Sequence, residues 1–153
     1  MVEKSKNFSQ QKGKRAEREV CRILQPIVDK VYQEVELEPP QVERNLMQSL
    51  KGGHDIVGLD WIAIEIKHHE TLQLSKWWEQ TRKQAGGIKI PVLLYKKSRQ
   101  GFRVIMNGRL PIGHEGEGGL ERAVVDISLP AFLKYFEKRL KFELNKESTS
   151  SIK

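Results

Sequence analysis

Two carboxylates and a lysine lie within two neighbouring apolar runs in the middle of the chain. Asp55 belongs to the first run, residues 54–58, and Glu65 and Lys67 belong to the second, residues 61–67. On a β-strand, side chains two residues apart point to the same face, so a tight turn between the runs would bring all three groups together. Two carboxylates at one place are costly unless a cation lies between them. The spacing therefore predicts a divalent-metal centre of the kind that nucleases use.

This set of residues suits the hydrolysis of a phosphodiester. The reaction needs an activated water, neutralised phosphoryl oxygens and support for the leaving oxygen, and a hard divalent cation supplies the last two. We expect Asp55 and Glu65 to bind the metal with the Ile66 carbonyl, and Lys67 to orient or help deprotonate the water. No His or Cys is required, which favours Mg²⁺, with Mn²⁺ as a substitute, over Zn²⁺. The spacing alone leaves open a second interpretation, an edge strand with an exposed ion pair.

The length and composition predict one domain over residues 1–144, with a flexible basic segment at 1–11 and a disordered tail at 145–153. The chain has 153 residues, 38% of them hydrophobic and 31% charged, which suffices for a buried core. No apolar run approaches the roughly 20 residues that span a bilayer, and the polar start has no secretory h-region. The single cysteine, Cys21, excludes an internal disulfide and a Cys-based zinc site. We expect a cytoplasmic protein (host cytoplasm if phage-encoded) with no membrane partner and no organic cofactor.

Positive charge is concentrated in two parts of the chain. The net charge is +7, and residues 80–114 contain eight Lys or Arg and no Asp or Glu. A solvated surface is the plain interpretation, but a one-signed stretch next to an acidic metal centre favours a phosphate-backbone partner. The predicted DNA-binding residues from the two basic clusters are Lys12, Lys14, Arg15, Lys96, Lys97 and Arg99.

Hydrophobic periodicity predicts the elements that must position these groups. Apolar residues recur at spacings of three and four in the first helix, where Pro26 would kink or end it. The expected elements are a helix at 13–31, a loop at 47–53, strands at 54–58 and 61–67, a helix at 72–85, strands at 91–95 and 102–106, an irregular stretch at 107–119, a weak strand at 123–127 and a final helix after Ser128. This order predicts an α/β fold, a mixed central sheet flanked by helices, with the catalytic groups at one edge.

The element order and two motifs resemble the PD-(D/E)xK nuclease superfamily of restriction-endonuclease fold. Residues 12–19 read Lys-Gly-Lys-Arg-Ala-Glu-Arg-Glu, which is similar to the Lys-Gly-x-x-Ala-Glu-Arg-Glu opening of archaeal-type Holliday-junction resolvases and their phage-borne relatives. Residues 86–93 resemble the Gly-Gly-Ile-Pro-Val-Leu of those resolvases, with two extra residues. The sequence departs from the pattern at His54, which replaces the proline of the superfamily's name, and after residue 107, where no counterpart is found.

The resemblance implies further site residues. The first glutamate of the opening motif joins the metal site in the resolvases, which corresponds to Glu17; Glu19 is the fallback, because only one of the two can face the site. Gln80 resembles a helix glutamine that other superfamily members bring into the active site. Arg44 lies where the resolvases carry a basic residue that contacts DNA.

The resemblance also implies a partner and an activity. It predicts a restriction-endonuclease-like core in a homodimer that cuts a branched DNA, the four-way junction, at two symmetric centres. Two alternatives stay open: another PD-(D/E)xK DNA nuclease of recombination, repair or restriction type, and a non-catalytic basic DNA-binding module. Exposed apolar faces on the helix at 72–85 or on the final helix could form the dimer contact, although core packing is the preferred interpretation of both.

Overall fold

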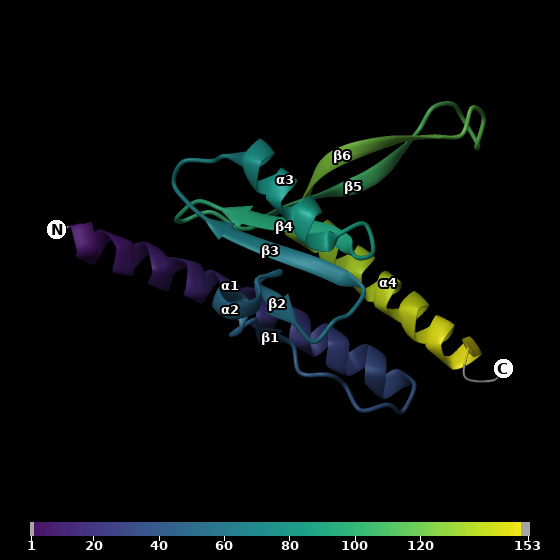
Figure 1. The fold of residues 1–153 in the computed structure, drawn as a ribbon. Helices are drawn as coiled ribbons and strands as arrows, with labels where there is room; N and C mark the ends of the chain where they lie inside the picture. The colour runs from purple at the N-terminus through teal and green to yellow at the C-terminus, as the bar shows by residue number, and fades with distance from the viewer. Residues whose placement is uncertain (1, 151–153) are drawn as a thin grey trace.

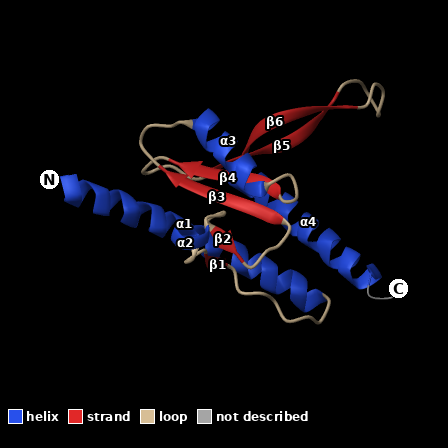
Figure 2. Ribbon diagram, viewed as in Figure 1, coloured by secondary structure: helices blue, strands red, loops and turns tan. Residues whose placement is uncertain are grey.

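A mixed β-sheet with helices on both faces forms the body of the protein (Figure 1; Figure 2). The structure is a computed structural model that describes residues 2–150. The sheet has the strand order β3-β4-β5-β6, in which β3 and β4 are parallel and the other neighbours antiparallel. In chain order the elements are α1 (Val2–Glu34), β1 (Glu43–Arg44), α2 (Gln48–Lys51), β2 (Ile56–Val57), β3 (Ile62–His68), α3 (Leu74–Ala85), β4 (Ile90–Lys96), β5 (Arg103–Pro111), β6 (Leu120–Ser128) and α4 (Leu129–Ser150). The predicted α/β fold is confirmed, and β3 forms one edge of the sheet. Within the described residues, no helix has the length and apolar character that a membrane crossing requires.

Strand alternation divides the sheet into two differently packed faces. The isoleucines of β3 belong to the larger buried cluster, which α1 and α4 cover. On the other face, which we call the α3 face, Trp77 and Trp78 of α3 pack on Leu93, Tyr95 and Ile105 of β4 and β5. Because Leu93 is the register partner of Glu65, the functional side chains of β3 lie on the α3 face. The apolar stripes of α3 and α4 are buried core, as preferred from the sequence.

The first helix is longer than its sequence pattern predicted. We expected a helix over 13–31 after a flexible segment, yet α1 begins at Val2 and ends at Glu34. Residues 2–11 contain neither Gly nor Pro, so no local signal ends the helix there. Pro26 lies inside the helix, where packing of the buried Leu24 and Val28 on either side offsets the lost hydrogen bond.

Elsewhere the elements differ from the prediction mainly in length. Residues 107–119 were expected to be irregular, but β5 continues to Pro111 and β6 begins at Leu120. The predicted loop 47–53 contains the single turn α2. Ser128 caps α4 as expected, because its hydroxyl accepts the Ala131 N–H at 3.3 Å. The tail predicted to be disordered from residue 145 is helical to Ser150, and its residues 151–153 lie outside the described part.

Candidate metal centre

Asp55 is held against the edge strand β3 by both its backbone and its side chain. Its N–H donates to the Ile64 carbonyl at 2.9 Å, and its Oδ2 accepts the Ile66 N–H at 2.7 Å. Its Oδ1 accepts the Gln48 side-chain N–H at 2.8 Å. The β1–β2 pair supports this position, since the Asn45 N–H donates to the Asp55 carbonyl at 2.8 Å. The prediction that Asp55 lies beside the second apolar run is therefore confirmed.

Glu65 is a buried carboxylate in the middle of β3. The residue is 3% exposed, and its Oε2 has no hydrogen-bond partner among the described residues. Its other oxygen, Oε1, lies 3.5 Å from the Lys67 ammonium nitrogen. A buried carboxylate oxygen without a donor is costly. A cation bound to Oε2 would supply the missing partner of this oxygen and balance the negative charge of the two carboxylates.

Burial and mutual repulsion raise the pKa of both carboxylates. The pKa of Glu65 rises to about 7, first because burial removes water and then because of the Asp55 charge; Lys67 opposes the rise. Burial also raises the pKa of Asp55, against the hydrogen bonds from Ile66 and Gln48. An added cation would favour the ionised form of both groups. Excess negative charge in a buried place is the electrostatic character of a divalent-metal site.

Glu17 is near this pair but bound to another residue. Its Oε2 accepts the Arg44 Nε–H at 2.7 Å, and its charge raises the pKa of Asp55 and of Glu65. Over the described part of the chain, no three His, Cys, Asp or Glu side chains form a group that could hold a metal. The structure thus brings Asp55 and Glu65 together, while the role of Glu17 as a further ligand stays a prediction. The fallback, Glu19, instead accepts from Lys96 at 3.1 Å.

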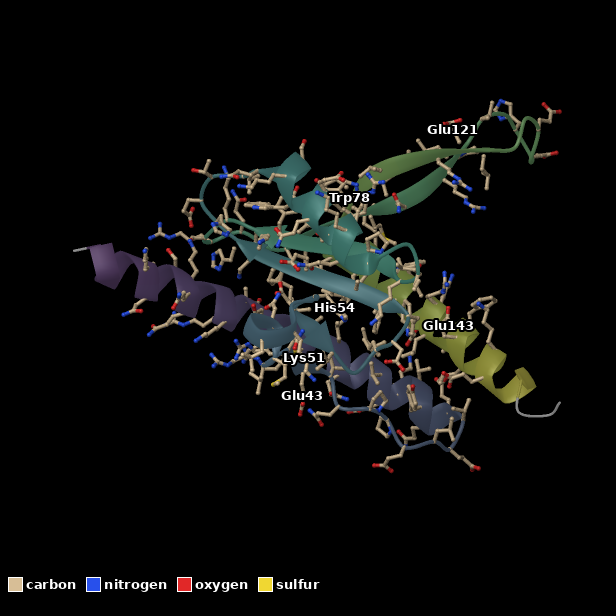
Figure 3. All side chains as sticks on the ribbon, viewed as in Figure 1. Glu43, Lys51, His54, Trp78, Glu121 and Glu143 are labelled. Carbon is tan, nitrogen blue, oxygen red and sulfur yellow. The ribbon has the colours of Figure 1, made fainter. Side chains whose placement is uncertain are left out.

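Two glutamines lie further out from this pair of carboxylates. Sequence reasoning missed Gln48, and the role predicted for Gln80 stays a prediction. Gln48 donates to Asp55 and also to the Gly53 carbonyl at 3.1 Å. The sequence predicted a loop at 47–53, and no local pattern there indicates that Gln48 would contact Asp55. Gln80 is exposed on α3, outside the buried face of that helix. Figure 3 shows His54, next to Asp55, on the β2 side of β3, and Trp78 on α3 above the sheet.

Several predicted DNA-binding residues meet where α1 crosses the end of β3. Lys12 binds Glu70 at 2.5 Å, and the Ser98 N–H donates to the same carboxylate at 3.1 Å. Lys12 and His68 line one small pocket, and burial, then the charges of Lys12 and Lys96, lower the pKa of His68. Lys96 is also within 4.9 Å of the centre of the Phe102 ring. Of the others, Lys14, Arg15 and Arg99 are exposed, Lys97 is partly exposed, and Arg44 binds Glu17.

Comparisons with known proteins match most of the chain to one family. The model of a family described as "Phage putative PDDEXK endonuclease" matches residues 8–127. No curated protein sequence matches the chain. Among solved structures, the chain is similar to Hjc, a Holliday junction resolvase from the archaeal hyperthermophile Archaeoglobus fulgidus, at 17% identity and a TM-score of 0.47, over 80% of this chain and 98% of that one. The family match includes Asp55, Glu65 and Lys67.

Proposed function

The chain belongs to the phage PDDEXK endonuclease family, and we propose that it is a Mg²⁺-dependent, structure-selective DNA endonuclease, specifically a Holliday-junction resolvase that acts as a homodimer in the host cytoplasm. Membership confirms the predicted resemblance to the PD-(D/E)xK superfamily and its restriction-endonuclease-like core. The resolvase assignment is supported by the opening motif at residues 12–19.

The observation that carries the metal proposal is the partnerless Oε2 of Glu65 beside the buried Asp55. These two carboxylates would hold the ion together with the Ile66 carbonyl. In an extended strand the N–H and C=O of one residue point the same way. Since the Ile66 N–H points to Asp55, its carbonyl also faces this side of β3. Glu17 would become a further ligand of the ion once its ion pair with Arg44 is broken.

The residues around the ion have separate tasks. A divalent cation held by these residues would supply neutralisation of the phosphoryl oxygens and support for the leaving oxygen. Lys67, whose ammonium lies beside Glu65, orients the attacking water, assists its deprotonation and stabilises developing negative charge. The Gln48 amide and the Ile66 N–H hold Asp55 in one orientation. Gln80 is a second-rank candidate that could help to position the water.

The DNA-binding surface that we propose includes α1 and the end of the sheet. Lys12 and Lys96 both act on the pKa of His68 there, and Arg15 borders the same small pocket as Lys12 and His68. Phosphate oxygens could replace the present acidic partners of these lysines. The full set that we assign to DNA is Lys12, Lys14, Arg15, Arg44, Lys96, Lys97 and Arg99.

Incubation with four-way junction, flap and linear duplex DNA under Mg²⁺ tests this function. We expect junction cleavage by the wild type, and we expect Glu65→Gln to bind junctions but lose nearly all cleavage. Glu79→Gln, on the exposed side of α3, is the matched control and should cut normally. Preference for linear ends would favour another PD-(D/E)xK nuclease. Unchanged activity of Glu65→Gln would leave only a basic DNA-binding module.

A further inference from the structure

The outer part of β5 and β6 forms a ribbon of two strands that leaves the body of the protein. The last pair between β4 and β5 is Val92 with Met106. Beyond it, β5 and β6 stay paired up to Pro111 with Leu120. Figure 1 shows this ribbon projecting away from the helices. The side chains of this ribbon contribute little to the hydrophobic core, so core packing does not explain why the two strands extend this far.

Two arginines lie directly opposite each other on one face of the ribbon. Arg109 of β5 pairs in register with Arg122 of β6, and like charges in opposite positions destabilise a ladder. Neither arginine forms an ion pair with any described residue. Both line a cavity of about 680 Å³ together with Arg82 of α3, and none of the described residues lining it is acidic.

The acids near this cavity do not neutralise the two arginines. Glu79 binds Arg82 at 3.3 Å, and Asp126 binds Arg103 at 2.7 Å. Glu121 neighbours Arg122 in β6, and strand alternation directs it to the opposite face. Arg109 and Arg122 therefore have no acidic ion-pair partner among the described residues, although the loop at the tip of the ribbon also carries Glu115 and Glu117.

We propose that the ribbon binds the sugar-phosphate backbone of a duplex arm of the DNA substrate through Arg109 and Arg122. This inference rests on the proposed nuclease function and adds a second contact surface to it. A guanidinium presents paired N–H donors that match phosphate oxygens. A two-stranded ribbon also has dimensions that the DNA major groove admits. Duplex DNA thus satisfies both the charge and the shape of this surface.

Sheet geometry gives an approximate distance between Arg109 and the proposed metal ligand Glu65. Glu65, Leu93 and Ile105 are register partners across β3, β4 and β5. Arg109 lies two strands away from Glu65, about 10 Å, and four residues further along, about 14 Å. The separation is therefore about 17 Å, which corresponds to about five base pairs of duplex. We expect the ribbon to contact phosphates at that distance from the scissile one.

The double substitution Arg109→Gln with Arg122→Gln tests the proposal by fluorescence anisotropy of a four-way junction in EDTA, where binding is measured without cleavage. In the proposed homodimer, loss of two phosphate contacts from each protomer should reduce the slope of log affinity against log salt by about 3.6, and weaken binding at 0.1 M salt on the order of 10³-fold. The matched control is Lys138→Gln with Lys146→Gln, which removes two exposed charges from α4 on the opposite face and should leave the slope nearly unchanged.

A second measurement locates the contact on the DNA. Neutral methylphosphonate linkages are placed one at a time along one arm. A linkage about five base pairs from the cleaved bond should weaken binding by the wild type but should not change the affinity of the double glutamine variant. The charge-preserving pair Arg109→Lys with Arg122→Lys should recover most of the salt slope, which separates a lost contact from a lost fold.

Several results would overturn this inference. An unchanged slope in the glutamine variant would remove the ribbon from the interface. A change in oligomeric state with unchanged DNA affinity would assign the ribbon to a protein partner instead. Because binding is measured in EDTA, the two proposals fail separately: an active nuclease with an unchanged slope refutes the ribbon alone, and a reduced slope without cleavage refutes the nuclease alone.

Discussion

Replacement of Glu65 by glutamine should stabilise the metal-free protein above neutral pH. Burial and the Asp55 charge raise the pKa of Glu65 from 4.5 to about 7. Between these values the native carboxyl holds a proton that the unfolded chain has released, so the free energy of unfolding falls as pH rises, by about 1.4 kcal/mol per pH unit. Over the whole window the loss amounts to about 3 kcal/mol. Glutamine keeps the shape of the side chain but cannot ionise, so the variant avoids this loss.

Urea unfolding in EDTA, from pH 4.5 to pH 9, measures the effect. We expect wild type and variant to differ least at the acid end, and the variant to be more stable by about 3 kcal/mol at pH 8, or about 6 to 12 °C in Tm for a chain of this size. The exposed Glu79→Gln should follow the wild type throughout. Asp55 is present in the wild type and in both variants, so its own pH dependence contributes to all three stability curves. The difference between the wild-type and Glu65→Gln curves therefore reports on Glu65. Parallel curves for wild type and Glu65→Gln would show that this carboxylate is solvated, and the reasoning would fail.

Three further results follow from the same site. Mg²⁺ at about 100 times its Kd should stabilise the wild type at pH 8 by about 2.7 kcal/mol, and thermal melts of Glu65→Gln should show almost none of this gain. Gln48→Ala should cost about 1 kcal/mol of stability through its lost bond to Asp55, and reduce kcat while junction affinity stays the same; a normal kcat would remove Gln48 from the site. Lys67→Met should lower the cleavage rate by about 10²- to 10⁴-fold in single-turnover assays without weakening junction binding, and a smaller loss would refute its role with the water.

Local strand patterns were sufficient to predict that three charged groups lie together. Asp55, Glu65 and Lys67 lie in short apolar runs, where the period of two determines which side chains share a face. The register of β3 with β4 confirms that Glu65 lies on the α3 face. Gln48 was missed because its contact depends on the path of the loop between β1 and β2, which no local periodicity encodes. The ion pair of Glu17 with Arg44 likewise depends on how α1 crosses β1.

The ribbon was missed for a different reason. Strands are found in a sequence through their alternation between buried and exposed positions. Beyond Met106, β5 has no sheet neighbour except β6, and four of its five residues from Asn107 to Pro111 are exposed, so the alternation is weak there. The start of α1 was missed in a similar way, because residues 6–11 of the helix are all exposed and show no buried periodicity.

A crystal structure of the protein soaked with Mn²⁺ tests the central claim most directly, since the anomalous signal locates the ion independently of any activity. The account predicts a peak bound by the carboxylates of Asp55 and Glu65 and by the Ile66 carbonyl, with Oε2 of Glu65 as a ligand. A peak elsewhere, or no peak with that oxygen still without a partner, would contradict it.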